Sequence, residues 1–279
     1  MFIITDNDRL LEHVPNVLAH VEGERSLFDK IHPWLTIAEQ WVIDTFTGNE
    51  TLQFIASDET SSVWAQTASV IVCEALQRAI PSLDLVLTPN GFGIVSNQNV
   101  APASKERVER LISTLKANRD YAINLLLDSL QYIDSWQDSK QRSWFAATLL
   151  QSPRACKSAI RNPGSLDEWE LFCASRVTAM NIESAIAEEF ISPELMIRLR
   201  LALISHDASN DDLSLALRVR DCVLHEVDGK RRDVPALNRI VNFIRKYPDH
   251  FPEWVNSDTA KLFAPPVFEN KKQSSGYFF

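Results

Sequence analysis

The chain has 279 residues, a formal net charge of −9 and a hydrophobic fraction of 45%, enough apolar side chain to pack one large domain or two smaller ones. The negative charge argues against a protein that wraps nucleic acid regardless of sequence, because phosphate binding depends on clustered Lys and Arg. Seven glycines are too few for a turn-rich all-β protein, and the frequent Leu, Ala, Glu, Arg and Gln favour helix. We therefore expect a mainly α protein made of helical bundles.

The cysteine spacing and the N-terminal residues both indicate a protein made in a reducing cytoplasm. Cys73, Cys156, Cys173 and Cys222 lie far apart without a CxxC pair, so we predict buried, reduced thiols and no zinc or dithiol motif. No stretch approaches the roughly 20 apolar residues of a membrane helix. The apolar start Met1–Ile4 is much shorter than the apolar region of a signal peptide. We expect no membrane contact.

Apolar side chains at helical spacing predict two helices at the start of the chain. Asp6–Asp8 can cap a first helix, which starts or kinks near Pro15. A second helix is predicted over Leu27–Phe46, with a break at Pro33 and a stop at Gly48. Its apolar residues indicate a core helix.

The pattern changes after the third helix. Ser57–Glu59 is predicted to open that helix, which ends at Pro81. Residues 83–102 then combine a weakly alternating apolar run, a Pro-Asn-Gly turn and a second short apolar run, a pattern typical of a β-hairpin arm. Ser104 can cap the helix that follows.

The rest of the chain predicts more helices. They run through Leu115 and Leu130 to Trp136, and in the second half over 166–190, 193–204, 211–227 and 234–247. We expect an N-terminal helical subdomain over 1–138 with the arm at 83–102, a linker region over 139–164, a C-terminal helical subdomain over 165–256 and an extended tail over 257–279.

A weak internal duplication is visible at two offsets. At 144 residues Glu39 aligns with Glu183 and Phe46 with Phe190; at 114 residues Asn124 aligns with Asn238. Two unrelated amphipathic helices also agree at apolar positions in some register, so this alternative stays open. The conserved order of the matches favours two duplicated helical subdomains, with the arm inserted in the first.

Catalytic patterns are not recognisable in the sequence. The six histidines are scattered, with no GxSxG elbow and no HExxH spacing. Asp6–Asp8 and Asn210–Asp212 lack the Gly and distal Glu of calcium loops and are read as helix caps. Gly91 and Gly93 lack a third glycine at dinucleotide spacing. We predict no catalytic, metal or cofactor-binding residues and no enzyme activity.

Two segments are candidates for contacts with other proteins. Amide and apolar side chains in the arm could pair with a neighbouring chain, and a polar linker at the C-terminus delivers aromatic residues that could dock in a partner's pocket. The arm residues are Phe92, Ile94, Val95, Asn97, Gln98 and Asn99, and the tail residues are Phe268, Tyr277, Phe278 and Phe279.

The arm also carries a family resemblance. The 22 residues Leu87–Val108 resemble the signature of an uncharacterised protein family from Bacteroidetes genomes, often found in prophage-like regions. The resemblance implies a structural protein of a tailed-phage particle, with a head-to-tail connector or neck component as the natural candidate. It implies no catalytic residues.

These observations lead to one expected function and two alternatives. We expect a non-enzymatic virion adaptor, made in the bacterial host cytoplasm, that forms a homo-oligomeric ring through arm and tail contacts and binds portal, tail or neck proteins. Sequence-specific nucleic-acid binding is not expected, although the ring could line a DNA channel. A tail-completion or tail-terminator protein is the first alternative, and a small-molecule enzyme with an unrecognised site is the second.

Overall fold

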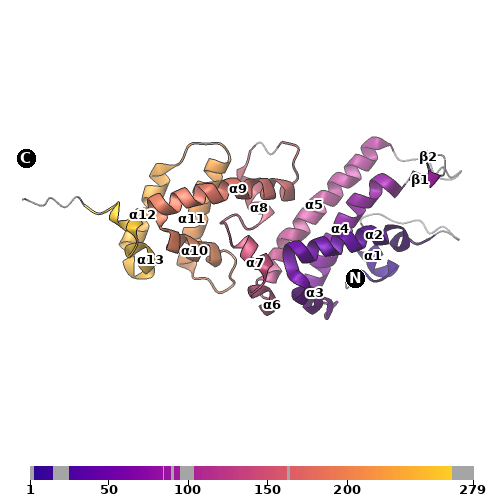
Figure 1. Ribbon diagram of the computed structural model, residues 1–279, viewed down its shortest axis with the longest axis horizontal. Coiled ribbons are helices and arrows are strands. Elements are labelled where there is room, and N and C mark those ends of the chain that lie inside the picture. Colours follow the sequence, from indigo (N-terminus) through magenta and orange to yellow (C-terminus); the bar gives the residue numbers. More distant parts are fainter. Residues whose placement is uncertain are drawn as a thin grey trace, which may run out of the picture.

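The protein is mainly helical, as the composition predicts. A computed structural model describes residues 3–14, 25–83, 85–88, 91–94, 104–161 and 164–265. Figure 1 shows an elongated body in which the early helices occupy one end and the late helices the other. Two groups of helices follow each other along the long axis, and we call them the N-terminal unit and the C-terminal unit.

The N-terminal unit contains seven helices, a π-helix and two strands among the described residues. In chain order they are α1 (Asn7–Glu12), α2 (Leu27–Val42), the π-helix η1 (Ile43–Thr47), α3 (Gly48–Ala56), α4 (Ser62–Leu83), β1 (Leu85–Thr88), β2 (Gly91–Ile94), α5 (Lys105–Leu130), α6 (Asp134–Gln137) and α7 (Lys140–Phe145).

The C-terminal unit repeats this order without the strands and with an added 3-10 turn. Its elements are α8 (Pro153–Ala159), α9 (Glu168–Ile186), the π-helix η2 (Ala187–Ile191), α10 (Pro193–Ala202), α11 (Asn210–Val227), α12 (Val234–Lys246), the 3-10 turn η3 (Pro248–His250), α13 (Pro252–Val255) and α14 (Asp258–Lys261).

Several predicted helix ends were wrong. α2 continues through Pro33 and α4 includes Pro81, so neither proline ends its helix. α4 begins at Ser62 because the Ser61 hydroxyl accepts the Trp64 amide at 3.2 Å, whereas Asp58 caps only a local turn. The helix predicted over 27–46 continues as α2 and η1.

The region 139–164 is packed against the core. It contains α7 and α8, and Leu149, Leu150 and Cys156 within it are fully buried. Pro153, one of the residues that mark this region as a linker in the sequence, starts α8 at its first turn, where a missing N–H costs little.

The two strands pair antiparallel, with Leu85 opposite Ile94 and Thr88 opposite Gly91. Figure 1 places them beyond the ends of α4 and α5, at the far end of the N-terminal unit. Only their backbone is described. The longer arm predicted up to residue 102 includes residues 95–102, which lie outside the described residues.

The two π-helices lie at matching places in their units. η1 and η2 each have five residues, and Ile43 and Ala187 begin them at an offset of 144. Each ends at a residue with positive φ, Gly48 at 72° and Ser192 at 78°, whose amide donates to the first carbonyl of the π-helix. The backbone therefore reverses in the same way in both units before the next helix begins. Glycine suits this conformation, and Ser192 is the only non-glycine described residue with positive φ.

Side-chain contacts to the π-helices also repeat, with their donor residues at an offset of 118. The Trp136 indole N–H donates to the Phe46 carbonyl at 2.7 Å, and the Trp254 indole N–H donates to the Phe190 carbonyl at 2.7 Å. A second pair of contacts ties the same π-helices to a later helix. Gln141 donates to the carbonyls of Ile43 and Asp44, and Thr259 donates to those of Ala187 and Glu188.

A buried glutamate holds the start of each unit. Glu39 on α2 accepts the Ile3 amide at 3.1 Å, and Glu183 on α9 accepts the Leu149 amide at 2.8 Å. In each unit the residue that donates this amide is the first of two adjacent, fully buried apolar residues, and a helix N-cap follows two residues after the second. These residues are Ile3, Ile4 and Asp6 in the N-terminal unit and Leu149, Leu150 and Ser152 in the C-terminal unit.

Candidate functional site

The predicted partner-binding residues lie at or beyond the edge of the described chain. Phe92 and Ile94 are in β2, where the backbone alone is described. The other arm residues, Val95, Asn97, Gln98 and Asn99, and the tail residues, Phe268, Tyr277, Phe278 and Phe279, lie outside the described residues. Their contacts therefore stay predictions.

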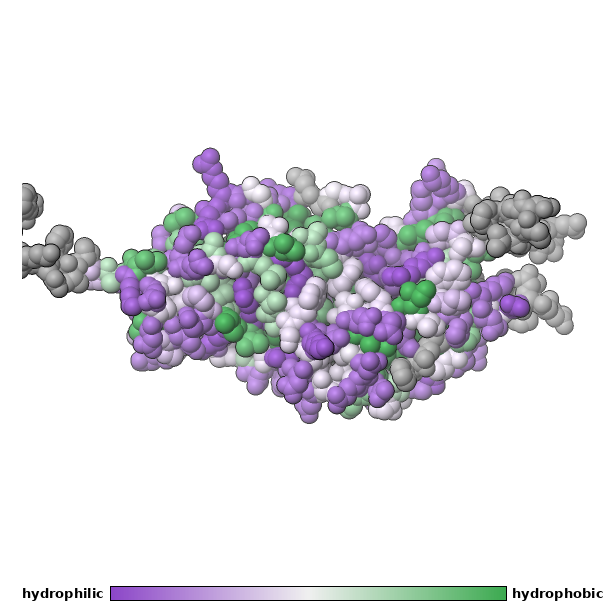
Figure 2. Space-filling model, viewed as in Figure 1, coloured by the Kyte–Doolittle hydropathy of each residue, from purple (hydrophilic) through white to green (hydrophobic). Residues whose placement is uncertain are grey.

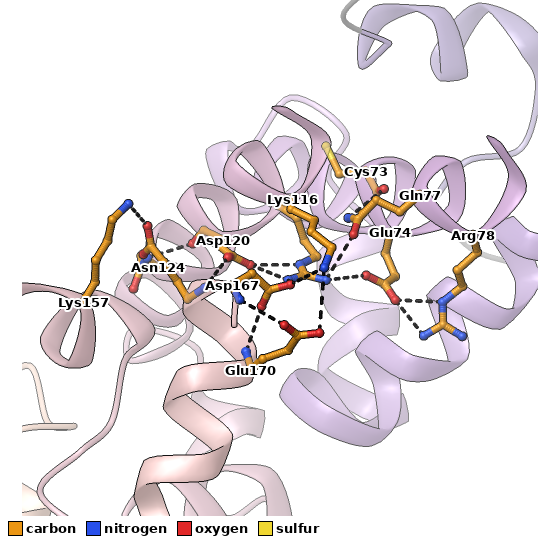
Figure 3. A network of polar contacts seen from close by, with 12 residues as sticks. Cys73, Glu74, Gln77, Arg78, Lys116, Asp120, Asn124, Lys157, Asp167 and Glu170 are labelled. Carbon is orange, nitrogen blue, oxygen red and sulfur yellow. Dashed lines mark hydrogen bonds and ion pairs between the residues drawn. The ribbon is translucent and has the colours of Figure 1, made fainter. Parts of the chain in front are cut away.

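The densest polar cluster joins the two units (Figure 3). Arg119 on α5 is 7% exposed and forms ion pairs with Glu74 on α4 at 3.0 Å, with Asp120 at 2.7 Å and with Asp167 before α9 at 3.0 Å. One guanidinium thus links three carboxylates from three segments. We call Glu74, Arg119, Asp120 and Asp167 the junction network.

The junction network also caps α9. Asp167 and Glu170 form a capping box, in which each side chain accepts the other residue's amide at 2.8 and 3.0 Å. Asp120 reaches across from α5 and accepts the Glu168 amide at 3.0 Å. Two carboxylates therefore satisfy free amides at a helix N-terminus, where the helix dipole favours negative charge.

The surroundings favour the charged forms of Asp167 and Arg119, whereas burial raises the pKa of Asp120. Burial alone raises the pKa of Asp167, but the Glu170 amide, Arg119 and Lys116 outweigh it and lower the pKa below its usual value. Burial likewise disfavours the charged form of Arg119, yet the facing carboxylates raise its pKa. The network is a set of compensated charges, which fits helix docking better than proton transfer.

A cavity of about 500 Å³ opens beside the network. Its lining includes Ile112 and Leu166 together with Lys116 and Lys157. Lys116 pairs with Asp167 at 3.1 Å, and Lys157 pairs with Glu168. Because both amines already have carboxylate partners, a ligand would have to displace an ion pair to use them.

Burial affects the reactivity of two described cysteines. Burial raises the pKa of Cys73 and Cys156 to about 12, so both stay protonated and weakly nucleophilic near pH 7. Across the described ranges, no three His, Cys, Asp or Glu side chains come together in a way that could hold a metal ion. No helix in the same ranges is long and apolar enough to cross a membrane.

An aromatic seam lies next to the network and also joins the units. Phe145 on α7 stacks between Phe46 of η1 at 6.0 Å and Phe172 of α9 at 6.2 Å. The Arg176 guanidinium lies 3.8 Å from the centroid of the Trp144 ring and donates to the Leu150 carbonyl at 2.7 Å. Trp144 and Phe145 of the N-terminal unit are thus held by Phe172 and Arg176 of the C-terminal unit.

Sequence reasoning missed both the junction network and the seam. Arg119 and Asp167 are 48 residues apart, and their meeting depends on how α5 and α9 pack. The one local signal was the Asp167-Glu168-Trp169-Glu170 stretch, an acidic N-cap with Glu three residues later.

Comparison with known proteins finds a family match for one part of the chain. Residues 14–146 match the model of a family described as "Family of unknown function (DUF6712)". The match covers 133 of the 279 residues and ends one residue after α7, which is where the N-terminal unit ends. No curated protein and no solved structure matches the chain.

Proposed function

We propose that this protein is a non-enzymatic assembly component, a head-to-tail connector or neck adaptor of a tailed-phage particle. The observation that supports the proposal is the position of the elements that adjoin the two predicted contact segments in the sequence. β1 and β2 lie at one end of the long axis, and α13, which comes shortly before the predicted tail, lies at the other end (Figure 1). Elements at opposite ends suit heterologous interfaces, which close into rings when the rotation allows.

The two units support this role as a duplicated module. They share the order of elements, the π-helices, the buried glutamates and the indole-to-carbonyl bonds. We propose that they descend from one helical unit, into which β1 and β2 were inserted once. The family match that ends after α7 supports this boundary.

The chemistry of the junction supports a structural role over an enzymatic one. Its buried charges are paired with one another and cap α9. A tail-completion or tail-terminator protein would use the same architecture. The resemblance of Leu87–Val108 to a prophage-associated family favours these two roles and the connector role over an enzyme.

Locating the protein in particles tests the proposal. Purified particles from a host that carries the gene should contain the protein by mass spectrometry, and a gold-labelled affinity tag should mark the neck in electron micrographs. Labelling at the tail tip or tail end would favour the tail proteins instead. A protein that is made in infected cells but missing from washed particles would refute the structural role.

A further inference from the structure

The seam between the units has an unmatched counterpart at the end of the C-terminal unit. At the offset of 118 that relates Trp136 to Trp254, Trp144 corresponds to Leu262 and Phe145 to Phe263. Phe263 contacts the ring of Phe190 at 6.2 Å, as Phe145 contacts the ring of Phe46 at 6.0 Å. The C-terminal unit therefore presents a pair, Leu262 and Phe263, that corresponds to Trp144 and Phe145 of the N-terminal unit. We call each pair a ridge.

The ridges differ in what covers them. Phe145 is fully buried under Phe172, whereas Phe263 is only partly buried, and Leu262 is 68% exposed. Val255, the last residue of α13, is 45% exposed. Figure 2 shows apolar surface at this end of the body, next to the point where the described chain stops. In the N-terminal unit Phe172 of the next unit covers Phe145, while Trp144 stays 42% exposed. Among the described residues no further unit follows Leu262 and Phe263.

The receiving surface also has a counterpart, at the other end of the molecule. At the offset of 144, Phe172 corresponds to Phe28 and Arg176 to His32. Phe28 and His32 lie one turn apart on α2 with ring centroids 5.5 Å apart, just as Phe172 lies beside Arg176. Phe28 is half-buried and His32 is exposed. These side chains are thus accessible to another molecule.

We propose that a second copy of this chain docks its Phe28–His32 surface on the Leu262–Phe263 ridge, which repeats between molecules the contact that joins the two units within one. The proposal rests on the assembly role proposed above and names the partner and the interface. Each molecule has one ridge and one receiving surface, at opposite ends, so the contact is head-to-tail and leads to a ring or a filament.

Leu262→Glu tests the interface without touching the core. We expect sedimentation velocity over a concentration series to show self-association of the wild type and at least a tenfold higher Kd for the variant, because a carboxylate would be buried against Phe28. Leu217→Glu on α11 is the matched control, since Leu217 is 40% exposed and belongs to neither surface. It should associate like the wild type.

A gain-of-function pair tests the register of the contact. Leu262→Trp with His32→Arg would rebuild between molecules the Trp144 and Arg176 pair, and should lower Kd roughly fivefold relative to the single variants.

Three results would overturn the inference: a wild type that stays monomeric at its highest attainable concentration, association unaffected by Leu262→Glu, or equal loss with Leu217→Glu. The assembly role is judged separately by the presence of the protein in particles. Self-association that ignores Leu262 would therefore refute this interface and leave that role standing.

Discussion

Replacing Arg119 with methionine should expose how strongly the junction network holds the two units together. The substitution keeps the aliphatic stem and removes a guanidinium that is 7% exposed and pairs with three carboxylates at 2.7–3.0 Å. Asp120 would then lose its ion pair, while Glu74 would keep only the partly exposed Arg78 and Asp167 only the partly exposed Lys116. Breaking a buried ion pair by removing one partner costs about 3–5 kcal/mol. For a chain of this size that loss corresponds to a Tm lower by roughly 10 °C.

The pH dependence distinguishes charge repulsion from lost packing. Without Arg119 the carboxylates raise one another's pKa in the folded state, so the folded protein binds protons more readily than the unfolded chain. The stability deficit of the variant should therefore shrink between pH 7.5 and pH 5. In the wild type the pKa of Asp167 is lowered from 3.8, so its contribution is present above that pH and is lost as the pH falls below it.

Thermal and urea unfolding followed by circular dichroism give both quantities. Arg154→Met is the matched control, because Arg154 pairs with Asp128 at 3.0 Å with both side chains about 60% exposed, and such pairs contribute less than about 1 kcal/mol. Equal losses in the two variants, or a deficit for Arg119→Met that is constant from pH 7.5 to pH 5, would refute the reasoning.

Three further predictions concern the repeated contacts and the thiols. Trp254→Phe should lower the free energy of unfolding by about 1–3 kcal/mol, because the Phe190 carbonyl loses a buried donor; Trp136→Phe should cost the same within error in urea unfolding, and a clear inequality would argue against equivalent units. Gly48→Ala should destabilise by about 1 kcal/mol through positive φ, and by more than Gly229→Ala, because only at Gly48 does a new Cβ approach Gln141, at 3.1 Å; equal losses in thermal unfolding would remove that contact from the argument. Cys73 and Cys156, with pKa raised to about 12, should react with Ellman's reagent at pH 8 only after denaturation, and rapid labelling of the native protein would show that these sites open.

The helices could be predicted from the sequence to the extent that local signals decide them. In the C-terminal unit the predicted helix over 211–227 lies within one residue of α11, because Ser209 caps it and the polar stretch after Val227 ends it. Pro33 and Pro81 misled the prediction, since burial of the apolar face of α2 and α4 outweighs one missing amide in each.

The candidate sites depended on tertiary packing and were harder to predict. The offset of 144 was visible in the sequence, but its meaning depended on contacts such as those of Glu39 and Glu183, which involve backbone amides more than 30 residues away. Arg119 read only as one of many charges on an amphipathic helix. Its three partners come from α4, α5 and the turn before α9, a combination that no local spacing encodes.

The unequal length of the long helices sets how far β1 and β2 lie from the body of the molecule. α5 has 26 residues and its counterpart α12 has 13, so at 1.5 Å per residue α5 extends about 20 Å further. The strands β1 and β2 sit at the end of that extension. Their distance from the body is therefore fixed by helix length, and each turn added to or removed from α4 and α5 together would change the reach to a neighbour by about 5 Å.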